Sequence, residues 1–163
     1  MDRVDDILAQ WARERPDLKT LPMGLIGRLR RIAHHLTREM EKTFAAHGLN
    51  DGSFDVLATL RRSGPPYALS PSELLATMMI TSGTMTHRID QLEKAGLVTR
   101  AGHPDDRRSV VISLTDKGFA QIDAAVTAHV QTQIRLTAAL SARDKAALDA
   151  LLKTYLAAFE PPA

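Results

Sequence analysis

Apolar residues recur at intervals of three or four positions along most of this 163-residue chain, a spacing that places them on one side of an α-helix. The stretches are bounded by serine, threonine, asparagine, proline and glycine, which favour helix ends. The pattern therefore predicts a mainly helical protein. Outside the central segment, helices are predicted from Asp2 to about Arg15, from Pro22 to His47, from Asn50 or Asp51 to Gly64, from Thr115 through Ile134 and from Ser141 through Phe159.

The segment from Leu69 to Thr115 predicts two helices joined by a short turn. The first begins at a capping box, in which a serine accepts from first-turn amides, a proline occupies the first helical position and an acid reaches back. These residues are Ser70, Pro71 and Glu73. The second helix is predicted from Ser82 to about Ala95, with Thr81 as its cap and Gly96 as its end. This arrangement is typical of a helix-turn-helix.

Two short runs rich in valine, isoleucine and threonine follow the second helix. They are Leu97–Ala101 and Ser109–Leu114, separated by the charged residues 102–108. We interpret them as a β-hairpin with a charged tip. The helix can enter a major groove while the tip reaches the neighbouring backbone or minor groove. The predicted fold class is mainly α with a small β-wing, a winged helix-turn-helix.

The helical phase of residues 82–95, at about 100° per residue, separates inward from outward positions. Met85, Ile89 and Leu92 fall on one side and are expected to face the core. The outward positions are Gly83, His87, Asp90, Gln91 and Lys94, with Thr84 and Thr86 on the shoulders. The candidate DNA contacts are Ser82, Thr84, Thr86, His87 and Gln91 in the helix and Arg107 and Arg108 in the hairpin tip. Arg88 lies beside the core-facing side, so we expect it to point toward the body of the protein.

Charge and composition refine this interpretation. The net charge of +2 is small for a DNA-binding protein, although the pI near 9.2 is basic. Electrostatic affinity per subunit should be modest, which favours a dimer. The terminal helices also have more apolar surface than a small winged-helix domain can cover, so the surplus is expected to be buried between subunits.

Several classes of function are disfavoured. The chain has no cysteine, which excludes a thiol switch or a thiolate metal site, and its six histidines show no metal or catalytic spacing. No glycine-rich phosphate loop or nucleophile–base motif suggests an enzyme. No stretch is long and apolar enough to cross a membrane, and the acidic amino terminus is unlike a secretory signal. We expect a cytoplasmic protein without a cofactor.

The motifs of the central segment resemble those of the MarR family of dimeric winged-helix regulators. They are Leu69–Leu74 (LSPSEL), Thr81–Asp90 (TSGTMTHRID), Leu92–Val98 (LEKAGLV) and the wing Asp105–Arg108 (DDRR) ending in Leu114–Thr115. The resemblance covers nearly the whole chain, as one unit of residues 1–163. It implies dimerisation helices in residues 1–48 and 116–163 and a DNA-binding region in residues 50–115. Two recognition helices would then meet successive major grooves of a palindromic operator, roughly 34 Å apart.

The resemblance also implies an effector. Family members that respond to urate and related purines have a tryptophan in an extra amino-terminal helix, an aspartate before the helix-turn-helix and arginines in the recognition helix and wing. By motif position these match Trp11, Asp55, Arg88 and Arg100. An indole can pack on a purine, guanidinium groups can pair with anionic oxygens and a carboxylate can accept from ring N–H groups.

Each of these four residues also has a structural interpretation. Trp11 can be an apolar contact that packs its helix onto the domain. Asp55, expected on the more polar side of its helix near the amino end, can be a favourable charge on the helix dipole. Arg88 and Arg100 can form internal salt bridges or contact phosphates.

The sequence thus predicts a ligand-responsive regulator that binds double-stranded DNA as a homodimer. It is expected to be a repressor released by a small anionic aromatic ligand such as urate or xanthine, since relatives of this architecture mostly occlude promoters. The alternatives are a winged-helix protein–protein interaction module and a regulator of the same type that responds to a phenolic compound.

Overall fold

The computed structural model describes residues 1–78, 85–103 and 106–160. Its helices are α1 (Arg3–Glu14), α2 (Leu21–Ala46), α3 (Asp51–Arg62), α4 (Pro71–Thr77), α5 (Met85–Lys94), α6 (Asp116–Leu136) and α7 (Ala142–Leu156). Its strands are β1 (Ala68–Leu69), β2 (Val98–His103) and β3 (Asp106–Leu114). The predicted fold class, mainly helical with a small β-wing, is confirmed.

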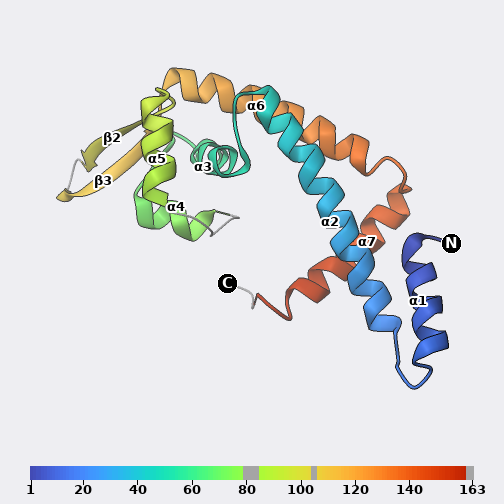
Figure 1. Ribbon diagram of the computed structural model, residues 1–163. Helices are drawn as coiled ribbons and strands as arrows, with labels where there is room; N and C mark the ends of the chain where they lie inside the picture. The colour runs from blue at the N-terminus through green and yellow to red at the C-terminus, as the bar shows by residue number, and fades with distance from the viewer. Residues whose placement is uncertain (79–84, 104–105, 161–163) are drawn as a thin grey trace.

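The elements are divided between two ends of the molecule (Figure 1). Helices α3, α4 and α5 and the β2–β3 hairpin gather at one end, and α1 lies at the other. The long helices α2 and α6 pack against each other and connect the two ends. Within the residues described, no helix combines the length and apolarity needed to cross a membrane.

The hairpin belongs to a three-stranded antiparallel sheet with the order β1-β3-β2. The strands are longer than the predicted runs, because pairing continues to His103 opposite Asp106 with a register shift after Gly102. Backbone pairing does not depend on the charged side chains that made residues 102–108 look like a loop. Strand β1 was not predicted, since two residues are too short to show an alternating pattern.

The predicted amino-terminal caps of α3, α4, α6 and α7 are confirmed, whereas α3 and α7 end two and three residues earlier than predicted, at Arg62 and Leu156. Asn50, Ser70, Thr115 and Ser141 each accept a hydrogen bond from a backbone amide of the first turn that follows. Gly96 has φ of +71°, the left-handed conformation that favours glycine after a helix. The predicted start of the recognition helix, Thr81 to Thr84, lies outside the described residues.

The core lies between α3, α4, α5, α6 and the sheet. Its fully buried side chains include Val56, Leu57, Leu60, Leu74, Ile112 and Ile122. Ile89 and Leu92 of α5 are buried in this cluster and Met85 packs against it. The predicted inward side of α5 is therefore confirmed, and apolar burial on this side fixes which residues of α5 face outward.

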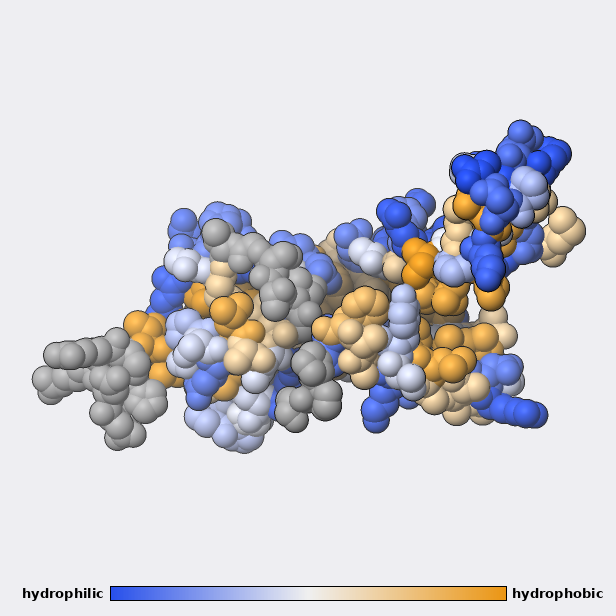
Figure 2. Space-filling view, turned by 90° about the horizontal axis from the view of Figure 1, so that it is seen from below, coloured by the Kyte–Doolittle hydropathy of each residue, from blue (hydrophilic) through white to orange (hydrophobic). Residues whose placement is uncertain are grey.

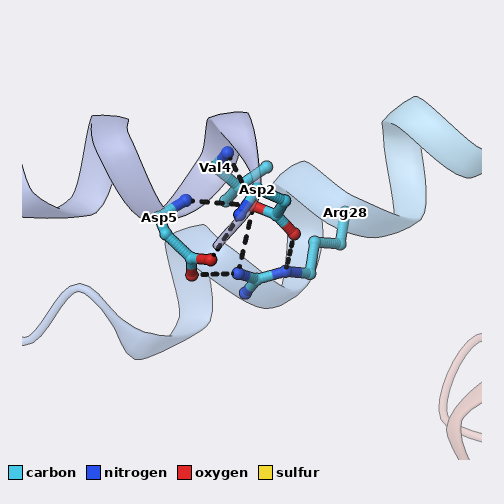
Figure 3. A network of polar contacts seen from close by, with 4 residues as sticks. All are labelled: Asp2, Val4, Asp5 and Arg28. Atoms are coloured by element: carbon cyan, nitrogen blue, oxygen red, sulfur yellow. Dashed lines mark hydrogen bonds and ion pairs between the residues drawn. The ribbon is translucent and has the colours of Figure 1, made fainter.

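Helix α1 is attached to the distal part of α2 by both apolar and ionic contacts. A side chain at Gly24 would collide with Leu8, and Gly27 lies under Val4. Arg28 of α2 pairs with Asp2, at 2.8 Å, and with Asp5, which together form the capping box of α1 (Figure 3). The hydrogen bond from Arg28 holds the pKa of Asp2 at about 2. Arg28 thus holds α1 on α2 although its side chain stays 39% exposed.

The apolar stripes of the terminal helices are largely uncovered within one chain. Leu25 and Ile32, which belong to the apolar stripe of α2, are 55% and 54% exposed. Helix α6 covers only the carboxyl-terminal half of α2, so these residues stay open to solvent. No residue of α7 is buried. Its exposed large apolar side chains are Leu148, Leu151, Leu152, Tyr155 and Leu156, with Phe159 just beyond its end. Figure 2 shows apolar side chains gathered on this part of the molecule.

The start of α6 is locked against the end of α5. The Thr115 hydroxyl donates to the Gly96 carbonyl at 2.8 Å, and Lys117 Nζ donates to the Ala95 carbonyl at 2.7 Å. A Cβ atom at Gly118 would lie 1.9 Å from the Leu97 carbonyl oxygen. Only glycine allows this approach of α6 to the residue that leads into the wing.

Gly118→Ala should therefore destabilise the protein by about 2 kcal/mol or more, because backbone atoms on both sides must move apart. Thermal unfolding followed by circular dichroism measures the loss. Gly102→Ala is the matched control, since nothing lies within 4 Å of the added Cβ. Equal melting temperatures for the two variants would contradict this packing.

Candidate nucleic-acid interface and effector pocket

The outward side of α5 is open to solvent. Thr86, His87 and Gln91 are exposed, as predicted, and the side chains of His87 and Gln91 lie together, with their Nε2 atoms 3.0 Å apart. They form a polar surface one turn long on the helix that follows the tight turn. Short polar side chains on a protruding helix can reach base edges and phosphates.

Other predicted DNA contacts cannot be placed. Ser82 and Thr84 lie outside the described residues. Arg107 and Arg108 lie in β3 by their backbone, and their side chains lie outside the described part of the chain. The position of the β2–β3 hairpin is clear: it extends away from α2 and α6 (Figure 1).

Arg100 of β2 ties the wing to the recognition helix. Its guanidinium pairs with Asp90, lies 3.6 Å from Glu93 and donates to the Thr86 carbonyl at 3.4 Å. Asp90 was predicted to face outward and is instead half-buried in this contact. Arg100 also lines a hollow of about 430 Å³ between α4, α5 and the wing. The other residues of this hollow are mostly apolar, among them Pro71, Leu75, Ile89, Val110 and Ile112.

Arg88 points the other way, toward the body of the protein, as predicted. A Cβ atom at Gly52 of α3 would lie 2.7 Å from Arg88 Nε, so the guanidinium packs on the bare backbone of the first turn of α3. Arg88 also lines a pocket of about 480 Å³ between α2, α3 and α5. Its remaining lining residues are Glu41, Ala45, Leu49, Asn50, Asp51 and Gly52. Sequence reasoning missed Gly52, because a glycine in a first helical turn gives no signal of its own.

Two carboxylates line this pocket, Asp51 of α3 and Glu41 of α2. Burial raises the pKa of Asp51, and the charges of Asp55 and Glu41 raise it further, whereas Arg88 acts in the opposite direction. Asp55 is only 7% exposed, so the expectation that it lies on a polar side of the helix was wrong. Its phase places it with the buried side of α3, next to Val56 and Thr59, rather than toward solvent. A buried carboxylate beside an arginine is a stronger candidate for a binding role than an exposed capping charge.

His129 of α6 packs between α2 and α3, close enough to Asp51 for the two charges to interact. Its ring stacks on Phe44 of α2, with centroids 5.2 Å apart, and lies tilted against Phe54 of α3 at 4.9 Å. The Gln133 amide nitrogen is 2.9 Å from His129 Nε2, and Nδ1 is buried without a hydrogen-bond partner among the described residues. Burial lowers the pKa of His129, opposed by the charge of Asp51. Sequence analysis did not single out this residue, because only the fold brings the three helices together.

The four residues matched to the urate-responsive pattern are not assembled in one chain. Asp55 and Arg88 both act on Asp51 at the pocket. Arg100 contacts the opposite side of α5, where Thr86 and Asp90 lie. Trp11, 40% exposed, follows Leu8, which packs on Gly24 of α2. Gly24 is 20 residues from Phe44, or about 30 Å along the helix, so Trp11 is far from Arg88 of its own chain.

No cluster of three or more histidine, aspartate or glutamate side chains suited to a metal ion occurs among the described residues.

Helix α5 presents polar residues to solvent on one side and is buried in the core on the other. The hairpin that follows is joined to α5 by Arg100. This arrangement defines a DNA-binding winged helix-turn-helix.

Residues 49–110 match the model of the MarR family. The HTH-type transcriptional regulator PecS of Dickeya dadantii is 46% identical over 149 residues, which cover 91% of this chain and 90% of that protein. The transcriptional repressor YetL of Bacillus subtilis is 34% identical over 98 residues, 60% of this chain and 58% of its own. The chain belongs to the MarR family of transcriptional regulators.

Solved structures agree with this assignment. A mutant of MarR from E. coli complexed with operator DNA matches with a TM-score of 0.71 and 26% identity, covering 85% of this chain and 96% of that one. BpsR of Bordetella bronchiseptica, whose DNA binding is regulated by 6-hydroxynicotinic acid, matches with a TM-score of 0.70 and 25% identity, covering 85% and 95%. The family and these relatives are DNA-binding regulators of transcription and not enzymes.

The environment of His129 makes the stability of the fold depend on pH. Because the folded protein holds the pKa of His129 below its ordinary value of 6.5, the unfolded chain takes up the proton first as the pH falls. The free energy of unfolding should therefore decrease as the pH falls through about 6.5. Urea unfolding at several pH values between about 8 and 5.5 measures this slope.

His129→Gln should flatten the slope over this range, whatever its effect on stability at neutral pH. His34→Gln, which changes an exposed histidine of α2, is the control and should leave the slope as in the wild type. If His129→Gln and the wild type show the same slope, His129 is not held neutral by burial.

Proposed function

We propose that two copies of the chain pair through residues 1–48 and 116–163, and that residues 50–115 of each bind one half of a palindromic operator. The uncovered apolar surface of α2 and α7 supports this pairing, because a chain that stayed alone would expose a continuous apolar face to water. Two recognition helices in one assembly also offset the small net charge per chain.

On DNA, the outward side of α5 enters the major groove. Base edges and nearby phosphates are proposed to be contacted by Ser82, Thr84, Thr86, His87 and Gln91. The DNA backbone or the minor groove beside the site is proposed to be contacted by Arg107 and Arg108. The observation that carries this proposal is the exposure of Thr86, His87 and Gln91 on a helix whose inner side is buried. The named repressor YetL and the operator complex of MarR support a repressor. A protein that binds chromosomal DNA in this way acts in the cytoplasm.

The DNA contacts can be separated by their salt dependence. Arg107→Ala or Arg108→Ala should weaken binding on all sequences and reduce the slope of log K against log salt by about 0.9 for each phosphate that the variant no longer neutralises. His87→Ala and Gln91→Ala should instead reduce discrimination between the protein's own promoter and unrelated DNA. Both are measured by mobility shift at several salt concentrations, with Arg13→Ala in α1 as the control. A wild-type protein that fails to shift its own upstream DNA would favour the protein–protein module.

The effector is proposed to bind at the pocket that Arg88 and Asp51 line. A small anionic aromatic compound such as urate or xanthine can pair an anionic oxygen with Arg88, the one cationic residue among the lining side chains described. Asp51 and Asp55 can accept from ring N–H groups. The carboxylates of Asp51, Asp55 and Glu41 repel a ligand that carries only negative charge. They favour a ligand that also has hydrogen-bond donors around its ring. Regulation of BpsR by 6-hydroxynicotinic acid shows that such a compound can act on a relative.

Release follows from the place of Arg88 on the recognition helix. A ligand that pairs with Arg88 changes the contact between α5 and α3, and a state with α5 shifted would no longer meet the groove in register. The ligand must bind that state more tightly than the DNA-bound state to shift the population. Trp11 can take part only from the second copy, because it lies far from Arg88 of its own chain.

Arg88→Ala should abolish ligand-induced release from the protein's own promoter fragment while leaving part of the DNA affinity. Gly52→Ala should weaken release in the same direction, because the new methyl group displaces Arg88 from α3. Mobility shift titrated with urate, xanthine and a phenolic acid measures both, with Arg13→Ala as control.

Release of Arg88→Ala by the same ligand concentration as the wild type would remove this residue from the switch. The phenolic alternative has its own site in the apolar hollow beside Arg100, and release by the phenolic acid alone would favour it.

A further inference from the structure

One side of α2 has five basic residues within nine positions. They are Arg30, Arg31, His34, His35 and Arg38, here named the α2 basic strip, and all five side chains are exposed. At about 100° per residue they fall on the side of the helix opposite the apolar stripe that includes Leu29 and Leu36. The strip is therefore turned away from α6, which packs on α2 through Met40, Thr43 and Phe44.

The arginines of the strip lie together without acidic neighbours. Within the described residues, no carboxylate lies at ion-pair distance from Arg30, Arg31 or Arg38. Several other basic side chains of the chain do pair with acids: Arg13, Arg15, Arg28, Lys42, Arg61, Arg100 and Arg135. The nearest following acid, Glu39, is engaged by Lys42 and Arg135. In a chain of net charge +2, the strip is a concentration of uncompensated positive charge.

The strip places its guanidinium groups on one exposed side of the helix. Arg30 and Arg38 stand about two turns apart, and Arg31 lies beside Arg30. No packing of the described core depends on them, since the strip is exposed. Such a pattern fits a surface that meets an anion, and guanidinium groups match phosphate oxygens with two parallel hydrogen bonds.

The dimensions fit a nucleic-acid backbone. From Arg30 to Arg38 the helix rises about 12 Å, which is the axial length of about three to four phosphates on one strand of duplex DNA. A membrane surface is a poorer match, because amphipathic helices that bind lipid place large apolar side chains beside their basic ones. On α2 the large apolar residues lie on the opposite side, where a second copy of the chain is proposed to cover them.

The strip is also remote from the recognition helix. Figure 1 shows α2 running from the winged-helix end toward α1, away from α5 and the hairpin. A duplex held by α5 and the wing is therefore not the one that the strip would contact. We propose that the α2 basic strip binds the phosphate backbone of a second DNA duplex, without sequence preference, while the recognition helices hold the first. The protein then bridges two DNA segments.

The test titrates a fluorescent duplex of arbitrary sequence onto protein saturated with its own unlabelled promoter fragment. Fluorescence anisotropy should show a second, salt-sensitive binding event. The variant Arg30→Gln/Arg31→Gln/Arg38→Gln keeps good helix formers and should weaken this event about tenfold or more, with a salt slope lower by about two to three. Its affinity for the promoter fragment should stay within about twofold of the wild type, because the recognition helix is unchanged.

The control Arg13→Gln/Arg15→Gln/Lys19→Gln removes the same charge from α1 and the loop after it, and should leave the second event as in the wild type. The labelled duplex is also titrated onto the protein alone, so a failure of promoter binding would be seen separately. The proposal is overturned if the wild type captures no second duplex, if both triple variants lose it equally, or if polyglutamate binds the strip as tightly as DNA does.

Discussion

The packing of the inner side of α5 against α3 and α4 is the contact on which the remaining features depend. Ile89 and Leu92 are buried with Leu57, Leu60 and Leu74, so the rotation of α5 about its axis is set by the loss of apolar surface to water. With that rotation fixed, Thr86, His87 and Gln91 face outward and Arg88 faces α3. The lock between Gly118 and Leu97 then fixes where the helix ends and where the wing begins. The polar, outward side of α5 is thus held in position by the apolar contacts of its inner side.

The two arginines that flank α5 give this helix two different connections. Arg100 joins its outward edge to the wing through Asp90 and Glu93, so helix and hairpin form one unit. Arg88 joins its inward edge to the bare backbone at Gly52, beside a pocket with Asp51. The contact of Arg100 with Asp90 and Glu93 is between side chains that are partly exposed to water. The contact of Arg88 with Gly52 lies beside a pocket that a ligand can enter. A compound that engages Arg88 therefore acts on the orientation of the whole unit without touching the DNA-facing residues.

Local signals in the sequence were sufficient to predict the helices, the β2–β3 hairpin and the inward side of α5, but not strand β1. Caps such as Ser70 and Thr115, and the stop at Gly96, depend on hydrogen bonds within a few residues, so they can be recognised without the fold. The contact between Arg88 and Gly52 and the stacking of His129 on Phe44 depend on helices distant in sequence, and no periodic pattern encodes them. The burial of Asp55 was missed because its charge was given more weight than its phase in α3. The surplus of apolar surface on the terminal helices was predicted, but not which residues carry it. An apolar stripe shows that a face will be covered, but not whether the same chain covers it, as at Leu25, Ile32 and α7.

The central claim is that this chain is half of an assembly, in which a second copy covers the apolar faces of α2 and α7 and supplies the second recognition helix. Analytical ultracentrifugation of the full chain, alone and with its own promoter fragment, tests this claim most directly. We predict a mass of twice the 17.9 kDa of one chain for the protein alone, and the mass of two chains plus one DNA fragment for the complex. A single chain in solution that binds the fragment as a single chain would contradict the account.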